Sequence, residues 1–126
     1  MPRRPKVLVV DDEPDYLQIA ARVASKAGCA VVTAQTALEG VALAGAEKPD
    51  MILLDVGLPD ISGFEAARRI RKVPALAAVP IIFFTVRSEL DMVSEGLGLG
   101  AAGYVLKPFD PDELARRIKA AVSPSS

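Results

Sequence analysis

The chain contains no histidine and no tryptophan, and it has a single cysteine, Cys29. The lack of histidine excludes a Ser-His-Asp triad, a histidine metal site and a phosphohistidine on this chain. One cysteine excludes an intrachain disulfide, and because it stands beside a strand-like run we expect a buried structural thiol. We therefore expect a cytoplasmic protein, where thiols stay reduced.

Positive and negative side chains are nearly balanced, with 15 Lys and Arg residues and 16 Asp and Glu residues. The net charge of −1 gives no general attraction to nucleic acid or to membranes. No apolar run approaches the ~20 residues of a membrane span, and the basic N-terminus leads into a strand-like run without a signal-peptide cleavage site. We expect one domain over residues 1–126, with a core at about 5–122 and a tail or linker start at 123–126.

Short apolar runs alternate with segments of helical spacing along the whole chain. Strands are predicted at residues 6–10, 30–34, 51–54, 80–84 and 103–106. Helices are predicted at about residues 17–27, 36–46, 63–72, 88–97 and 110–122. Five alternations with short connections predict an α/β fold, a parallel sheet with helices on both faces. No G-x-G-x-x-G follows the first strand and no P-loop motif occurs, which disfavours dinucleotide and P-loop nucleotide sites.

Polar residues stand at the carboxyl ends of four predicted strands. The first strand is followed by Asp11 and Asp12, the third by Asp55, the fourth by Thr85 and the fifth by Lys107. These ends meet at one edge of a parallel sheet, where ligands bind in open α/β folds. Each residue alone has an ordinary explanation, because aspartates cap turns and helices and strand-end Thr or Lys residues are common. Their shared register is what indicates a site.

Carboxylates held close together repel one another, and a divalent cation with oxygen ligands relieves that repulsion. Mg²⁺ suits such a set because it needs only one or two carboxylates and keeps several waters. The ammonium of Lys107 and the hydroxyl of Thr85 suit the oxygens of a phosphoryl group. Aspartate is an established covalent carrier of phosphate, so Asp55 is the candidate acceptor.

Four segments together resemble the receiver domain of two-component response regulators, over essentially the whole chain. They are VVDDEP at residues 9–14, LDVGLP at 54–59 with Gly63, Phe84-Thr85, and YVLKP at 104–108. The resemblance implies a doubly wound, flavodoxin-like sheet of five parallel strands in the order 2-1-3-4-5. It also implies that Asp55 is the phosphoacceptor.

Further roles follow from the same resemblance. Asp12 is expected to bind Mg²⁺ directly and Asp11 largely through water, while Gly57 offers its backbone carbonyl and Asp55 a carboxylate oxygen. Lys107 would bind the phosphoryl group. Thr85 and Tyr104 would form a switch pair, and the Lys107–Pro108 peptide bond is expected to be cis.

These expectations describe a signalling switch rather than a turnover enzyme, although the domain would take phosphate from a donor and remove it again. The expected partners are a histidine kinase or histidine phosphotransfer protein, a downstream protein or output domain, and a second copy in a phosphorylation-dependent homodimer. The phosphorylated form would change the face made by the fourth helix, fifth strand and fifth helix.

Two other functions are compatible with parts of the pattern. A phosphohydrolase of the haloacid dehalogenase type also uses Asp, Thr, Lys and Mg²⁺, but it requires a second aspartate where this chain has Gly57. A protein-interaction module could keep the same fold and work without phosphate, although the complete acidic set argues against it.

Overall fold

The computed structural model describes residues 4–86 and 98–122. Its strands form one parallel sheet in the order β2-β1-β3-β4-β5, which confirms the predicted α/β fold and strand order. The strands are β1 (Lys6–Val10), β2 (Ala30–Ala34), β3 (Met51–Asp55), β4 (Ile81–Thr85) and β5 (Ala101–Leu106).

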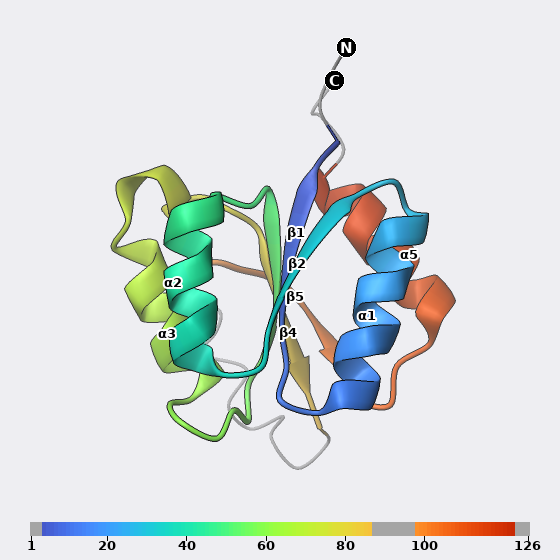
Figure 1. Cartoon of the computed structure of the whole chain (residues 1–126), viewed down its shortest axis with the longest axis horizontal. Coiled ribbons are helices and arrows are strands. Elements are labelled where there is room, and N and C mark those ends of the chain that lie inside the picture. The colour runs from blue at the N-terminus through green and yellow to red at the C-terminus, as the bar shows by residue number, and fades with distance from the viewer. Residues whose placement is uncertain (1–3, 87–97, 123–126) are drawn as a thin grey trace.

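Helices cover both faces of the sheet, as predicted, with α1 and α5 on one side and α2 and α3 on the other (Figure 1). The helices are α1 (Pro14–Lys26), α2 (Ala37–Glu47), α3 (Gly63–Arg71) and α5 (Pro111–Val122). A 3₁₀ turn, η1 (Pro74–Leu76), interrupts the connection between α3 and β4, where the sequence indicated only a proline-bounded loop. The helix expected at residues 88–97 lies outside the described residues.

The central strands are apolar without interruption because each side of the sheet is buried under helices. All five residues of β3 and all five of β4 are buried. One apolar cluster, which includes Leu54, Phe64 and Phe83, packs between the sheet and α2 and α3. A second cluster, which includes Leu53 and Leu114, packs against α1 and α5. Cys29 belongs to this second cluster, which confirms the buried thiol.

Side-chain caps fix where three of the helices begin. The hydroxyl of Thr36 accepts a hydrogen bond from the Glu39 amide at 3.1 Å, within a Thr-x-x-Glu capping box. The hydroxyl of Ser62 caps α3 in the same way, through the Glu65 amide at 3.1 Å, although this cap was not predicted. At α5, the Asp110 carboxylate accepts from the amide of Asp112 at 2.9 Å.

The strand boundaries differ slightly from those predicted, in a way that matters for function. Asp55 and Thr85 are the last residues of β3 and β4 rather than the first residues after them. Parallel pairing of Asp55 with Phe84 holds the Asp55 backbone in the sheet. Asp55 and Thr85 are therefore held by the sheet itself.

In the described part of the chain, no helix combines the length and apolarity needed to cross a membrane.

Gly63 lets α3 begin against the end of β3. The Gly63 amide donates to the Val56 carbonyl at 2.9 Å, and a Cβ added at Gly63 would overlap the carbonyl oxygen of Asp55. Backbone atoms cannot rotate away as a flexible side chain can. The absence of a side chain at Gly63 is therefore a condition for placing Asp55.

We expect Gly63→Ala to destabilise the fold by about 1–3 kcal/mol, the usual cost of overpacking a well-packed site. Gly45→Ala is the matched control, because Gly45 lies inside α2 and an added Cβ would meet nothing within 4 Å. That control should instead be more stable by about 0.5–1 kcal/mol, since alanine favours helix. Denaturant unfolding of both variants measures the difference, and equal stabilities would show that the Gly63–Asp55 approach has no energetic role.

Candidate phosphoacceptor site

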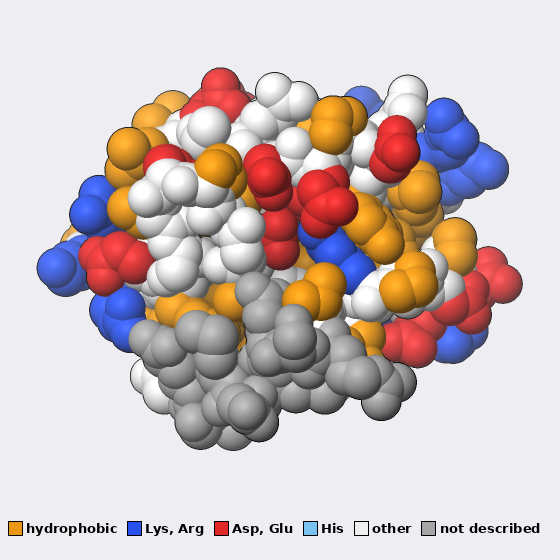
Figure 2. All heavy atoms as spheres, turned by 90° about the horizontal axis from the view of Figure 1, so that it is seen from below, with side chains coloured by type: hydrophobic (Ala, Val, Ile, Leu, Met, Phe, Trp, Pro, Cys, Tyr) orange, Lys and Arg blue, Asp and Glu red, His pale blue; other side chains and the backbone are white. Residues whose placement is uncertain are grey.

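The polar residues predicted from the sequence meet at the carboxyl edge of the sheet. Asp11 follows β1, Asp55 ends β3, Thr85 ends β4 and Lys107 follows β5. Figure 2 looks onto this edge and shows acidic side chains gathered beside a basic one near the middle of the face. Among the described residues, the buried polar or charged side chains are those of the same four residues, Asp11, Asp55, Thr85 and Lys107.

Lys107 is the basic centre of the site. Its Nζ lies 2.8 Å from Asp11 Oδ2, 2.9 Å from Glu13 Oε1 and 3.4 Å from Asp55 Oδ2. The Lys107 side chain is only 3% exposed, so its pairs with the buried Asp11 and Asp55 are shielded from solvent, whereas the Glu13 side chain is 54% exposed. Burial by itself would lower the pKa of Lys107, but the hydrogen bonds to Asp11 and Glu13 raise it above the usual value. Lys107 is therefore charged at neutral pH.

Burial makes the ionised forms of Asp11 and Asp55 less favourable than they would be in water. Burial raises the pKa of Asp55 from 3.8 to about 6, and the neighbouring Asp11 charge adds to this against the opposing effect of Lys107. Burial also raises the pKa of Asp11, although its hydrogen bond with Lys107 works in the other direction. At neutral pH Asp55 is still mostly ionised, as a nucleophile must be.

Carboxylate oxygens in this cluster are close enough to share a cation. One oxygen from each of Asp11, Asp12, Glu13 and Asp55 lies within 4.8 Å of the others. All are hard oxygen donors, the kind that Mg²⁺ prefers, and one ammonium does not neutralise all of them. The residues present therefore fit a divalent cation. Sequence reasoning did not assign Glu13 to the site, although its place directly after Asp12 was a signal.

The loop after β3 is fixed from both ends. The Gly57 amide donates to Asp55 Oδ1 at 3.3 Å, and Gly57 itself is exposed. Asp60, three residues later, accepts from the amides of Ala37 at 2.9 Å and Leu38 at 2.8 Å, which ties the loop to the start of α2. Gly57, the predicted carbonyl ligand, thus belongs to a loop anchored on both sides.

Thr85 ends β4 and pairs with Leu106, whereas Tyr104 lies inside the neighbouring strand β5, two residues before that pair. The Thr85 hydroxyl donates to the Val86 carbonyl at 3.2 Å. Tyr104 pairs with Phe83 across β4 and β5 and stacks on its ring, with centroids 5.6 Å apart and planes inclined by 25°. The Tyr104 side chain is half-buried, and the apolar ring of Phe83 lies on one side of it.

Tyr16 was not identified from the sequence, because one tyrosine in an amphipathic helix gives no signal of its own. Its ring centroid lies 4.5 Å from Lys107 Nζ, and it also contacts the ring of Phe109 at 5.4 Å. An aromatic face attracts an ammonium, so Tyr16 helps to hold Lys107 under the start of α1.

The Lys107–Pro108 bond is cis, which confirms the expectation.

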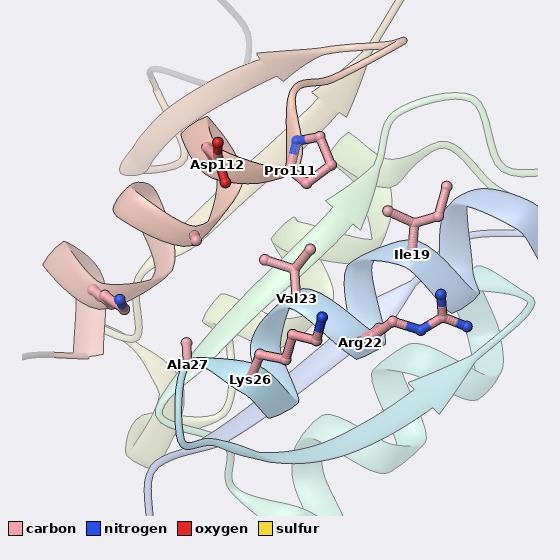
Figure 3. Close-up of a pocket in the computed structure, with 9 residues that line it drawn as sticks. Ile19, Arg22, Val23, Lys26, Ala27, Pro111 and Asp112 are labelled. Atoms are coloured by element: carbon pink, nitrogen blue, oxygen red, sulfur yellow. The ribbon is translucent and has the colours of Figure 1, made fainter.

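A separate pocket of about 480 Å³ lies between α1 and α5. Figure 3 shows Ile19, Val23 and Lys26 on α1 and Pro111 and Asp112 at the start of α5. The pocket shares no residue with the acidic cluster. The chemistry indicated by the carboxylates is therefore not located in the pocket.

Residues 7–119 match the response regulator receiver domain family. The chain belongs to this family. The match confirms the resemblance seen in the sequence motifs.

Curated relatives of this receiver domain include both long and short proteins. It is 40% identical over 114 residues to the phosphate regulon transcriptional regulatory protein PhoB of Pseudomonas aeruginosa, which covers 90% of this chain and 50% of PhoB. It is 34% identical over 118 residues to Protein PilH of the same organism, covering 94% of this chain and 98% of PilH. The chain thus spans about half the length of relatives such as PhoB and nearly all of PilH.

Solved structures of similar proteins have the same fold. The chemotaxis response regulator CheY4 of Vibrio cholerae is 31% identical, with a TM-score of 0.88 over 94% of this chain and 99% of that one. A CheY-like receiver domain protein of Methanospirillum hungatei is 29% identical, with a TM-score of 0.86 over 95% and 94% of the two chains. The receiver domain therefore has the CheY-like form of the doubly wound sheet.

The raised pKa of Asp55 predicts a pH-dependent effect on stability. Asp55 holds its proton more tightly in the folded state, so the stability present below about pH 4 is lost as pH rises through about 6. In metal-free protein at pH 7, Asp55→Asn should therefore be about 1–3 kcal/mol more stable than wild type, and this advantage should disappear toward pH 4. Thermal or urea unfolding in EDTA at both pH values measures it.

Asp60→Asn is the control, because the exposed Asp60 carboxylate caps α2 instead of facing other carboxylates. We expect it to be no more stable than wild type at either pH. An Asp55→Asn protein that is less stable than wild type at pH 7 would contradict a repulsive acidic site.

Proposed function

We propose that this receiver domain is a phosphorylation-activated signalling switch whose acceptor is Asp55. The observation that supports this most strongly is the placement of Asp55 at the end of β3, beside the ammonium of Lys107 and the carboxylate of Asp11. An ionised nucleophile, a fixed positive charge and a group of cation ligands are the parts that phosphoryl transfer requires.

The phosphoryl donor is inferred from chemistry. A carboxylate oxygen of Asp55 would attack the phosphorus of a phosphohistidine, the P–N bond would break, and the imidazole nitrogen would leave with the electron pair and then take a proton. Because this chain has no histidine, another domain or protein must supply it. A histidine kinase or a histidine phosphotransfer protein is the class of partner that carries such a group.

We assign Asp12, Asp55 and the Gly57 carbonyl as direct ligands of Mg²⁺, with Asp11 acting largely through water. Bound there, Mg²⁺ would neutralise negative charge on the phosphoryl oxygens. Lys107 would bind another phosphoryl oxygen, since its ammonium already lies 3.4 Å from Asp55 Oδ2. Thr85 would donate its hydroxyl to a third.

The signal would leave the site through Thr85 and Tyr104. In the resting structure the Thr85 hydroxyl donates to the Val86 carbonyl, a bond that it would exchange for one to the phosphoryl group. That shift would open space beside β4, and the half-buried ring of Tyr104 would move into it. The face that includes β5 and α5 would then bind a downstream protein, an output domain or a second copy.

The acceptor assignment predicts one covalent change. Incubation with Mg²⁺ and acetyl phosphate should add a single phosphoryl group, visible as an increase in intact mass and located at Asp55 by peptide mapping. Asp55→Asn and Asp12→Ala should both lose the modification, whereas Asp15→Asn should keep it because Asp15 is an exposed acid in the first turn of α1.

Other outcomes distinguish the alternative functions. Hydrolysis of many equivalents of donor would support a phosphohydrolase instead. No modification and no hydrolysis, in protein shown to be folded, would support a module that works without phosphate.

The switch assignment predicts that Thr85→Ala separates phosphorylation from output. The variant should still accept phosphate, because Asp55, the cation ligands and Lys107 remain. Phosphorylation should increase its partner binding or self-association less than it does in wild type. The gain should fall by at most ~5–150-fold, because coupling free energies between sites are typically ~1–3 kcal/mol.

Thr33→Ala removes the same hydroxyl group from an exposed position on the edge strand β2 and serves as the control. It should keep the full gain. If phosphorylated Thr85→Ala gains as much as phosphorylated wild type, Thr85 is only a strand-end residue and the switch pair is wrong.

A further inference from the structure

Glu13 makes one of the two shortest ion pairs of Lys107. The Glu13 oxygen lies 2.9 Å from Nζ, compared with 3.4 Å for the nearest Asp55 oxygen. The ammonium therefore contacts all three carboxylates but pairs more closely with Asp11 and Glu13 than with the proposed acceptor.

The two residues that hold Lys107 differ in their freedom to move. The Asp11 side chain is fully buried, and its other oxygen accepts from the Glu13 amide at 2.9 Å. The Glu13 side chain is 54% exposed, while its backbone is held by that hydrogen bond and by the start of α1. Glu13 can thus release Lys107 by rotating its side chain into solvent, without a change in the backbone.

Phosphoryl oxygens and the Glu13 carboxylate would compete for the same donor. An ammonium has three N–H donors, and in the resting structure Asp11, Glu13 and Asp55 surround it, with the Tyr16 ring 4.5 Å from Nζ. A phosphoryl group on Asp55 would bring further negative charge toward Glu13. The exposed side chain is the one that would be displaced.

We propose that Glu13 is a positioning residue that pairs with Lys107, competes with a phosphoryl group on Asp55 for its ammonium, and so limits how readily Asp55 becomes phosphorylated. This inference rests on the proposed function of Asp55 and adds to it a residue that regulates the site. Glu13 acts through Lys107 and does not itself touch the phosphoryl group. Removing its carboxylate leaves Lys107 free to pair with the phosphoryl oxygens.

The size of the effect follows from the exposure of Glu13. Ion pairs with one half-exposed partner are weak, and their typical strength corresponds to a factor of about two to five in an equilibrium constant. Glu13→Gln should therefore reach half-maximal phosphorylation at an acetyl phosphate concentration about two to five times lower than wild type. Glu13→Ala should shift the same way, since it also removes the competing carboxylate.

The experiment measures the phosphorylated fraction by intact mass over a range of acetyl phosphate concentrations, at saturating Mg²⁺ so that metal affinity does not enter. Asp15→Asn is the matched control, because Asp15 is an exposed acid in the first turn of the same helix. It removes one negative charge near the site and leaves the Glu13–Lys107 pair intact. The control should behave like wild type.

A second readout tests the resting contact without metal or phosphate. The Lys107 ammonium signal in ¹⁵N NMR should show faster hydrogen exchange with solvent in metal-free Glu13→Gln than in wild type, and Asp15→Asn should not change it. If wild type takes up no phosphate but this exchange differs, the proposed function fails while the holding contact stands.

Two results would overturn the inference itself. One is equal or weaker phosphorylation of both Glu13 variants relative to wild type, which would make Glu13 neutral or a supporting ligand. The other is an equal shift in Asp15→Asn, which would assign the effect to net charge alone.

Discussion

The structure of the site depends on one ammonium, that of Lys107, placed among carboxylates at the carboxyl edge of the sheet. Lys107 lies within 3.4 Å of oxygens from Asp11, Glu13 and Asp55, almost out of contact with solvent. Burial raises the pKa of Asp55, and the nearby Asp11 charge raises it further against the opposing effect of Lys107. One ammonium therefore does not neutralise the whole acidic set. The remaining repulsion between the ionised carboxylates destabilises the domain, and a bound divalent cation would relieve it.

The rest of the fold serves to keep this arrangement in place. Because Asp55 and Thr85 end two central, fully buried strands, they cannot move apart without disrupting the sheet. Gly63 brings α3 against the Asp55 backbone, and Asp60 anchors the following loop to α2. The backbone of the acceptor is thus firmly supported, whereas the Glu13 side chain is 54% exposed and can rotate into solvent.

The sequence predicted much of this, and the reason is physical. Continuous apolar strands and polar strand ends express local rules, so the alternation of strands and helices and the positions of Asp11, Asp55, Thr85 and Lys107 could be read in advance. The order of the strands in the sheet came from the family resemblance. The contacts of Glu13 and Tyr16 could not be read in advance, because they depend on how the start of α1 meets Lys107, which is 94 residues after Glu13 in the sequence and follows β5. Strand ends were misplaced by a residue because sheet pairing, not hydrophobicity, decides where a strand stops.

The most direct test of a carboxylate cluster built to accept a cation is the Mg²⁺ dependence of unfolding. A ligand that binds only the folded state adds RT ln(1 + [L]/Kd), about 2.7 kcal/mol at a hundredfold excess over Kd. The unfolding free energy of wild type should rise with Mg²⁺ along this curve, whereas that of Asp12→Ala should stay flat. An equal rise in both proteins, or none in wild type, would contradict the account.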